Sequence, residues 1–195
     1  MRLYPEVYRA RREPALLTVP PLPVVAVDGV GALDGPAYHE AVEALYGVSH
    51  ALRAGLRRDG VPDYAVSPLE GQWWGDVADI AGPDRVAARW TMFIAQPPQV
   101  TDALVAGAVE TTRRRRPSAA LDKVERRTLD EGRSVQALHV GPRGAEHPAL
   151  ERLLGFVEGS GHTVAGPLHE IYLSDPARTA PDRRRTILRY PVRAG

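Results

Sequence analysis

A glutamate and a tyrosine near the C-terminus have the residue types and the spacing for acid–base chemistry in a pocket. Glu170 and Tyr172 are two residues apart in the run 168–173, which alternates as a strand does, so both side chains point to one face. Burying a carboxylate among leucine, isoleucine and tyrosine is costly unless a partner compensates its charge. The spacing alone fits either a polar outer face on a half-solvated sheet or an acid set into a cleft.

A second group of aromatic and acidic residues lies in the segment 67–74, Ser-Pro-Leu-Glu-Gly-Gln-Trp-Trp. Trp73 and Trp74 are adjacent, so a strand turns them to opposite faces, and one can line a cleft while the other packs in the core. Both could also be structural, because tryptophan is commonly buried. Glu70 fits either a solvated turn residue or a second acid in the same cleft.

A cleft with tryptophan and tyrosine walls and one carboxylate suits a flat aromatic molecule, with or without a positive charge. The rings supply contact area and cation–π attraction, and the carboxylate compensates a positive charge. The same residues also suit catalysis, because a carboxylate desolvated by aromatic walls binds a proton more readily and can act as a base on water. Tyr172 could orient that water or stabilise a phenolate that develops on a leaving group.

The motifs of other enzyme classes are incomplete. Ser67 is not part of a Gly-x-Ser-x-Gly elbow. His169-Glu170 begins like a zinc-protease motif, but Leu173 stands where the second histidine is required. The six histidines are scattered and the chain has no cysteine, so we expect neither a metal ion nor another cofactor.

Two further motifs indicate ordinary structure. Gly29-Val-Gly31 lacks the third glycine of a dinucleotide-binding loop, so it predicts a turn or bulge that needs the backbone freedom of glycine. The basic run Arg113–Arg116 falls at the end of an expected helix, one turn after Glu110, and is typical of a solvated helix end. Neither motif predicts a nucleotide or nucleic-acid site.

The composition predicts a globular protein with no direct nucleic-acid or membrane partner. The 195 residues are 44% hydrophobic and 25% charged, enough for one domain with a real core. The formal net charge of +1 gives no general attraction to nucleic acid or anionic lipid. The start of the chain lacks an apolar signal core and no run reaches membrane-spanning length, so we expect a cytoplasmic protein. Its oligomeric state, monomer or homodimer, stays open.

Hydrophobic spacing and turn residues predict a strand–helix–strand–strand order that occurs twice. Gly132 in the link 130–133 predicts a hairpin between two strands. Residues 1–21, rich in proline, predict an extended lead-in, and residues 22–195 form the domain, in units of about 22–96 and 122–193. The expected helices are 38–58, 101–116 and 146–158, of which 101–116 links the two units. The expected strands are 24–27, 64–74, 86–95, two within 124–140, 166–173 and 186–192. Residues 76–85 are expected to form a loop.

Four blocks of sequence resemble the GyrI-like small-molecule-binding family, in the same order and over nearly all of the chain after residue 22. They are the C-terminal run 169–192, the segment 67–74, the run 120–125 and the run 136–142. The resemblance implies an α+β fold of duplicated β-α-β-β halves related by a pseudo-twofold. In that fold a curved antiparallel sheet forms a central ligand cleft.

The resemblance also implies a function. Free-standing members with these blocks are similar to cyclopropanoid hydrolases, which open the cyclopropane of DNA-alkylating natural products by adding water. Carried onto this chain, Glu170 would be the acid at the cleft centre, Tyr172 its polar partner, and Trp73 or Trp74 the stacking surface. Further wall positions, which no motif fixes, are Tyr38, Tyr46, Trp90 and His139.

Three hypotheses follow, of which we favour the first. In the first hypothesis, the protein is a hydrolase that detoxifies cyclopropane-bearing alkylators, with Glu170 activating water. Alternatively, it is a non-catalytic multidrug-binding protein that sequesters or senses aromatic cations, or an interaction protein like the gyrase inhibitors of the same superfamily. Residues 1–22 are too short for a helix-turn-helix domain, so a self-contained transcription regulator is not expected.

Overall fold

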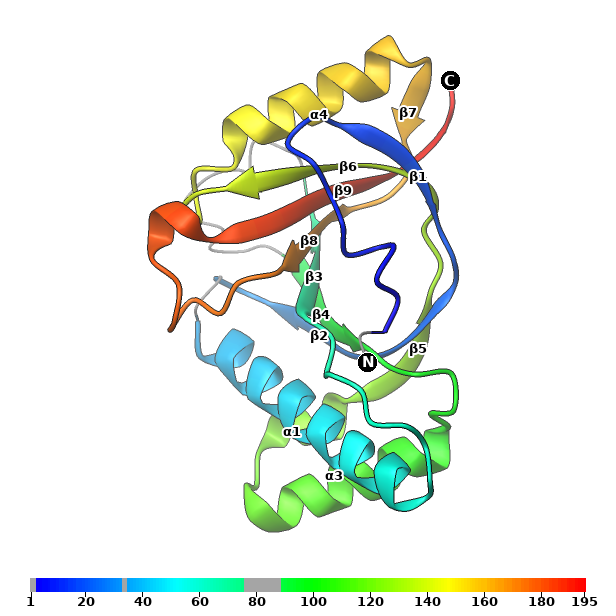
Figure 1. The fold of residues 1–195 in the computed structure, drawn as a ribbon. Coiled ribbons are helices and arrows are strands. Elements are labelled where there is room, and N and C mark those ends of the chain that lie inside the picture. Colours follow the sequence, from blue (N-terminus) through cyan, green and yellow to red (C-terminus); the bar gives the residue numbers. More distant parts are fainter. Residues whose placement is uncertain (1–2, 33–34, 76–88) are drawn as a thin grey trace.

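The strands of the sheet are arranged symmetrically about one central antiparallel pair (Figure 1). The computed structural model describes residues 3–32, 35–75 and 89–195. The central pair is β3 (Leu69–Trp74) and β8 (Leu168–Tyr172). Outward from β3 lie β4 (Arg89–Ala95), β2 (Leu22–Val30) and β5 (Glu125–Leu129), and outward from β8 lie β9 (Arg185–Ala194), β6 (Gly132–Val140) and β1 (Ala15–Val19). A short strand, β7 (His162–Val164), pairs with the far end of β9.

Each half of the sheet carries one helix between its first and second strands. The order β2–α1–β3–β4 recurs as β6–α4–β8–β9, with α1 spanning Pro36–Arg58 and α4 spanning His147–Gly159. A third helix, α3 (Asp102–Arg115), follows the first half and packs against α1. The expected α+β class, with a curved antiparallel sheet that forms a cleft, is confirmed.

Local sequence explains where the helices begin and end. The Oγ1 atom of Thr101 accepts a hydrogen bond from the backbone N–H of Leu104 at 3.3 Å and caps α3, as a threonine does at this position. Helix α1 has Pro36 in its first turn and is followed by Gly60, whose φ of +84° is one that glycine adopts without strain. The helices predicted at 38–58, 101–116 and 146–158 agree with α1, α3 and α4 within two residues.

The two faces of the sheet are covered by different parts of the chain. On the first, which we call the helix face, α1 packs on β2 and β4 while α4 packs on β6 and β9. The central strands β3 and β8 therefore lie between the two helices. On the opposite face, residues 7–14 run across the sheet (Figure 1). Val7 and Tyr8 pack there against apolar side chains of the sheet. We call this the N-terminal face.

Two strands that local pattern did not predict extend the sheet. Residues 15–19, part of the predicted lead-in, form β1 and pair with β6, and residues 162–164 form β7. Both are short, and the hydrogen bonds that define them are made to strands remote in sequence. A local pattern contains no information on those partners.

The predicted hairpin at residues 130–133 is wrong. Strand β5 pairs with β2, and β6 pairs with β1 and β9, so β5 and β6 are successive parts of one long strand that bends between them. Gly132 does have a positive φ of +58°, but the chain changes direction there without reversing. Opposite the bend stand Pro20 and Pro21, which have no N–H to donate, so the ladder is interrupted there.

Two other features of the chain bear on the sequence predictions. In the described residues, the structure has no helix that is both long enough and apolar enough to cross a membrane. The loop predicted at 76–85 and the start of the strand predicted at 86–95 lie outside the described residues.

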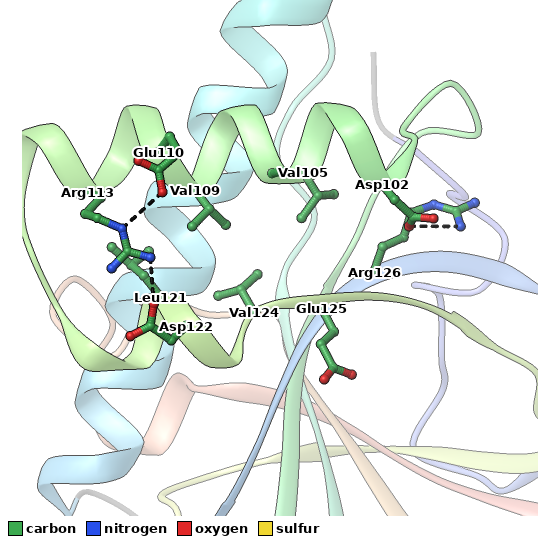
Figure 2. A pocket seen from close by; sticks show the side chains of 11 residues that line it. Asp102, Val105, Val109, Glu110, Arg113, Leu121, Asp122, Val124, Glu125 and Arg126 are labelled. Atoms are coloured by element: carbon green, nitrogen blue, oxygen red, sulfur yellow. Dashed lines mark hydrogen bonds and ion pairs between the residues drawn. The ribbon is translucent and has the colours of Figure 1, made fainter.

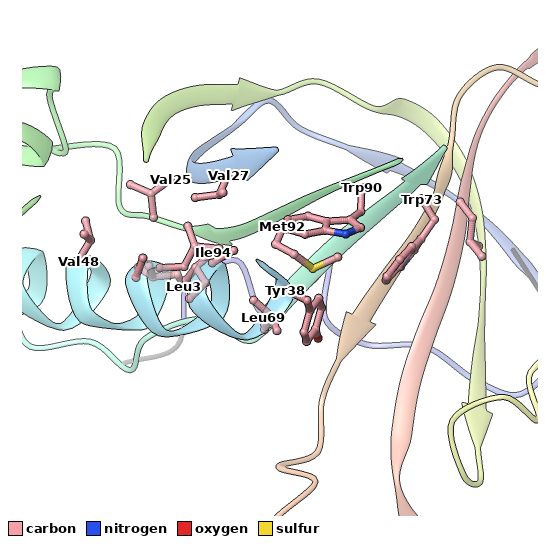
Figure 3. Packing of buried hydrophobic residues seen from close by; sticks show 14 of the residues in the cluster. Leu3, Val25, Val27, Tyr38, Val48, Leu69, Trp73, Trp90, Met92 and Ile94 are labelled. Atoms are coloured by element: carbon pink, nitrogen blue, oxygen red, sulfur yellow. The ribbon is translucent and has the colours of Figure 1, made fainter. Parts of the chain in front are cut away.

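The helix face contains a close packing contact that tests this architecture. Gly29 in β2 pairs with Trp90 in β4, and a Cβ atom on Gly29 would overlap the Trp90 ring (Figure 3 shows this ring among the buried side chains). We expect Gly29→Ala to lower the free energy of unfolding by about 1–3 kcal/mol, because the buried ring has to move. Urea denaturation followed by far-UV circular dichroism measures the change.

The matched control is Gly107→Ala in α3, where an added Cβ has no neighbour within 4 Å. This variant should be more stable than the wild type by about 0.5–1 kcal/mol, because alanine suits a helix interior better than glycine does. Equal unfolding midpoints for the two variants would contradict the packing described for Trp90.

Candidate functional site

A chain of hydrogen bonds ends on Glu170 in the middle of the helix face. The indole Nε1–H of Trp73 donates to Oη of Tyr172 at 3.3 Å, and the Tyr172 hydroxyl donates to Oε2 of Glu170 at 2.8 Å. Glu170 is 1% exposed and Trp73 is fully buried. The bonds hold the carboxylate in one orientation within an apolar region.

The register of β3 and β8 explains why these three side chains meet. Gly71 stands opposite Glu170, and Trp73 stands opposite Leu168, so the odd residues of β3 share a face with the even residues of β8. The prediction that Glu170 and Tyr172 lie on one face of a strand is confirmed by their hydrogen bond. The structure also shows that Trp73, and not Trp74, joins them.

The immediate neighbours of Glu170 across the sheet are apolar. Leu188 of β9 is its partner on one side and is fully buried. On the other side Gly71 has no side chain, and Met92 of β4 fills the space, since a Cβ on Gly71 would lie 2.5 Å from the Met92 Cε atom. This apolar environment strengthens any electrostatic interaction that the Glu170 carboxylate makes.

Two residues from outside the central strands complete the rim of the site. Tyr38, in the first turns of α1, packs edge-to-face on Trp90 with ring centroids 6.1 Å apart (Figure 3). Arg143, in the turn between β6 and α4, places its Cζ atom 5.1 Å from the ring centroid of Tyr172 and 5.9 Å from that of Tyr38. Arg143 thus connects the two halves of the protein across the site.

Sequence reasoning missed Arg143. It lies in the run Gly141-Pro-Arg-Gly144, directly after the block 136–142 that carries part of the family resemblance. A lone arginine in a turn gives no local signal, because its neighbours come from α1 and β8.

Three other predicted wall residues have their recorded contacts with other parts of the chain. Trp74 points to the N-terminal face, is 39% exposed, and lies under the Arg89 guanidinium at 4.9 Å. Tyr46 is on α1 and stacks on His50 at 6.3 Å. His139 is on the helix face, where its Nε2 atom lies 3.3 Å from the carbonyl oxygen of Pro142.

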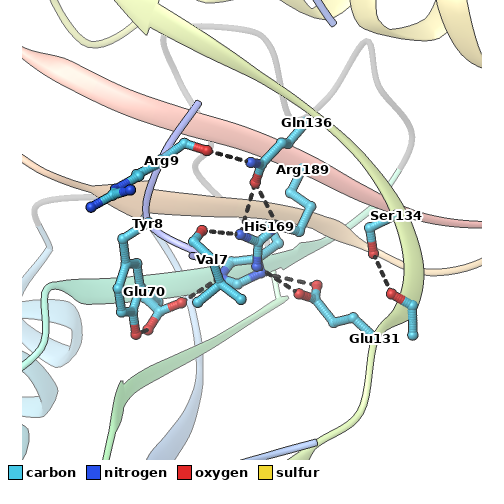
Figure 4. A network of polar contacts seen from close by, with 10 residues as sticks. Val7, Tyr8, Arg9, Glu70, Glu131, Ser134, Gln136, His169 and Arg189 are labelled. Atoms are coloured by element: carbon cyan, nitrogen blue, oxygen red, sulfur yellow. Dashed lines mark hydrogen bonds and ion pairs between the residues drawn. The ribbon is translucent and has the colours of Figure 1, made fainter. Parts of the chain in front are cut away.

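Glu70, the predicted second acid, lies on the N-terminal face in a buried ionic cluster (Figure 4). Its Oε1 accepts a hydrogen bond from the Tyr8 hydroxyl at 2.8 Å, and its Oε2 lies 3.1 Å from Nε2 of His169. The other ring nitrogen of His169 lies 2.9 Å from Glu131, which also pairs with Arg189 at 3.0 Å. The structure therefore separates Glu70 from Glu170 by the thickness of the sheet.

The same cluster fastens the N-terminal segment to the sheet. Arg189 donates to the Val7 carbonyl oxygen, at 2.6 Å, and to Oε1 of Gln136. The Gln136 amide donates in turn to the Arg9 carbonyl oxygen at 2.8 Å. These bonds satisfy buried polar groups that would otherwise be costly, so the segment and the cluster stabilise one another.

The ionisation of the cluster follows from its geometry. Burial alone would raise the pKa of Glu131, but the charges of His169 and Arg189 outweigh it and bring that pKa to about 2. Burial alone would lower the pKa of His169, but the carboxylates of Glu131 and Glu70 outweigh it and raise that pKa above its ordinary value. With His169 protonated, two carboxylates face two cations.

Two cavities between described residues lie away from Glu170. A groove of about 560 Å³ separates α3 from β5 (Figure 2). Its floor is apolar, and on its rim Arg113 pairs with Glu110 at 3.2 Å and with Asp122 at 2.8 Å. A smaller cavity of about 120 Å³ lies between β2 and α1 beside Trp90. Apart from Trp90, no residue predicted for the site lines either of them.

Comparison with known protein families identifies the fold. A family model for the GyrI-like small molecule binding domain matches residues 12–193. The chain belongs to the GyrI-like family. The resemblance inferred from the sequence blocks is confirmed, and Glu170 and Tyr172 lie within the matched region. No curated protein sequence matches the chain significantly.

Solved structures share this GyrI-like fold. An uncharacterized conserved protein from Listeria innocua superposes with a TM-score of 0.88 at 35% identity, with 97% of each chain covered. A protein from the same organism described as a hydrolase superposes with a TM-score of 0.85 at 34% identity, over 97% of this chain and 96% of that one. The C-terminal domain of EcmrR, at 12% identity and a TM-score of 0.56 over 94% and 98% of the two chains, shares the fold alone.

The buried cluster predicts how stability depends on pH. His169 has a raised pKa in the folded protein. Its contribution to stability is therefore complete below pH 6.5, its ordinary pKa, and is lost as the pH rises through the pKa of the folded protein. Glu131 has a lowered pKa, so it contributes fully to stability above pH 4.5, its ordinary pKa, and contributes less as the pH falls towards about 2. We therefore expect the melting temperature of the wild type to decrease above pH 6.5.

Differential scanning calorimetry from pH 5 to 9 measures this dependence. In His169→Gln the melting temperature should be lower at pH 5 and should vary less above pH 6.5, because the titrating group is gone. A variant with the same pH profile as the wild type would show that His169 is not the source of the dependence.

Proposed function

We propose that this GyrI-like protein is a hydrolase that binds a flat aromatic molecule on the helix face and opens a strained cyclopropane ring in it by adding water. The observation that carries the proposal is the buried chain of hydrogen bonds from Trp73 through Tyr172 to Glu170. It sets one oriented carboxylate among aromatic side chains at the centre of the sheet.

The proposed reaction needs one base and one group that tolerates negative charge. Glu170 removes a proton from water, whose oxygen bonds to a methylene carbon of the cyclopropane. The carbon–carbon bond of the ring breaks, and its electron pair passes through the conjugated system of the substrate to a carbonyl oxygen, which becomes a phenolate. That oxygen then takes up a proton and Glu170 gives up the one it gained, so the carboxylate is restored and the net change is the addition of one water.

Tyr172 serves this chemistry through its position. Its hydroxyl donates to Glu170 and accepts from Trp73, so the phenol and the carboxylate cannot rotate independently. Orientation of this kind is a major source of rate enhancement because the reacting groups are already aligned. The partly exposed ring of Tyr172 offers a stacking surface for a planar substrate, and the buried Trp73 holds that ring in place through its hydrogen bond.

The solved structures support the reaction class without identifying the substrate. Two solved structures from Listeria innocua described as hydrolases, at 34% and 33% identity, match the chain over 97% of its length. Non-catalytic binding of aromatic cations and a gyrase-inhibitor-like interaction remain the alternatives that the first experiment separates.

Turnover of a cyclopropane-bearing alkylator tests the role of Glu170. We expect the wild type to convert many equivalents of the compound into a product heavier by one water, as followed by mass spectrometry. Glu170→Gln should lower kcat by about 10²–10⁴-fold, because the base is lost while the shape is kept.

Glu70→Gln is the matched control, since it places the same amide in the same sheet on the opposite face. This variant is expected to be less stable but to keep its kcat at a temperature where it is folded. Retention of the unchanged compound at one per chain would instead indicate a binding protein. No interaction with the compound would favour a protein partner.

The two adjacent tryptophans provide a second test. Trp73→Phe removes the Nε1–H that donates to Tyr172, and we expect kcat/KM to fall about tenfold, the value of one buried hydrogen bond. Trp74→Phe changes a side chain that is 39% exposed on the other face and should leave kcat/KM within about twofold. Equal losses in the two variants would contradict the assignment of Trp73 to the site.

A further inference from the structure

The position of Arg143 bears on the charge of the molecule that the site accepts. Its guanidinium lies over the rings of both Tyr172 and Tyr38, with Cζ 5.1 Å and 5.9 Å from their centroids. Both distances are within the range of cation–π attraction. The Nη2 atom also lies 3.5 Å from the Tyr38 hydroxyl oxygen. Arg143 therefore occupies the aromatic surface that a cationic ligand would otherwise use.

The turn that carries Arg143 is held in place by hydrogen bonds on both sides. The N–H of Gly141 donates to the carbonyl oxygen of Arg184 at 2.9 Å. The N–H of Gly144 donates at 2.7 Å to Oε2 of Glu146, whose side chain is buried. Gly144 has a φ of +88°, which favours glycine. The guanidinium is thus presented by an ordered turn.

A negative and a positive side chain both lie at the site before any ligand arrives. Glu170 supplies a carboxylate and Arg143 a guanidinium, and Tyr172 lies in contact with both. A ligand with a permanent positive charge that stacks on Tyr172 would be repelled by the Arg143 guanidinium over the same ring. A neutral ligand meets no such repulsion, and an oxygen on it that becomes negative would be stabilised by the guanidinium.

We propose that Arg143 is a specificity-determining residue that makes the site select neutral aromatic molecules carrying a carbonyl oxygen and disfavour aromatic cations. This inference rests on the proposed function for the place where the ligand binds. It adds the charge class of the substrate and a role for a side chain remote in sequence from Glu170. In the proposed reaction, Arg143 stabilises the phenolate as the ring opens.

Equilibrium binding of two aromatic probes of equal size tests the selection without any turnover. Acridone is neutral and has one carbonyl group, whereas N-methylacridinium is a cation, and the fluorescence of both reports binding. We expect the wild type to bind acridone more tightly. In Arg143→Gln the cation should bind about tenfold more tightly than in the wild type, and acridone should bind no better, because the repelling charge has gone.

Two variants serve as controls. Arg178→Gln removes an exposed arginine that pairs with Asp175 and should leave both affinities unchanged. Arg143→Lys keeps the charge and should still disfavour the cation, although an ammonium group lacks the planar stacking of a guanidinium. An unchanged ratio of the two affinities in Arg143→Gln would overturn the proposal, as would a preference of the wild type for the cation.

The binding and turnover experiments fail independently. If the selection is observed but no compound is hydrolysed, the role of Arg143 in specificity stands and the hydrolase assignment does not. If hydrolysis depends on Glu170 but Arg143→Gln leaves both kcat and the ratio of affinities unchanged, the hydrolase stands and the role of Arg143 is overturned. If neither probe binds the wild type or its variants, the proposed selection by Arg143 is overturned, and the turnover experiment alone decides the hydrolase assignment.

Discussion

The register of the central strand pair determines where every side chain of the candidate site lies. Because Gly71 stands opposite Glu170, the position beside the carboxylate has no side chain of its own, and Met92 and Trp73 close over it. A slip of one residue would turn Trp74 and Glu70 towards the helices and Trp73 away from them. The burial of Trp73 and the apolar side chains on the same face oppose such a slip, so the hydrophobic core also fixes the geometry of the site.

The two faces of the sheet accommodate buried carboxylates in different ways. On the N-terminal face, His169 lies between Glu70 and Glu131, and Glu131 also pairs with Arg189, so opposite charges compensate both carboxylates directly. On the helix face, Glu170 accepts a hydrogen bond from a neutral phenol. Both carboxylate oxygens of Glu70 are engaged within the buried cluster, by Tyr8 and His169, on the face that the N-terminal segment covers. Glu170 instead lies beside Tyr172, whose ring is partly exposed, and this difference favours Glu170 as the reactive acid.

The sequence predicted well what depends on local pattern. Capping and stop residues such as Thr101 and Gly60 set the helix ends, and the alternation around Glu170 and Tyr172 predicted their common face. Pairing was less predictable: β1 has its partner in β6, and the bend at Gly132 resembles a hairpin turn in its residues alone. The same limit applies to the site, because Glu70 and Glu170 differ only in the face to which the register turns them, and Arg143 reaches Tyr38 through tertiary contacts.

The attachment of the N-terminal segment constrains the order in which the protein can fold during synthesis. The bond from Arg189 to the Val7 carbonyl oxygen joins residues 182 positions apart, and strand β1 pairs with a strand from the second half of the chain. Contacts this remote in sequence form slowly, because a long loop must close before they are made. On the ribosome, the bonds from Arg189 to Val7 and from β6 to β1 therefore cannot form until β6 and β9 have emerged. The part of the protein that is made first is among the last to be placed.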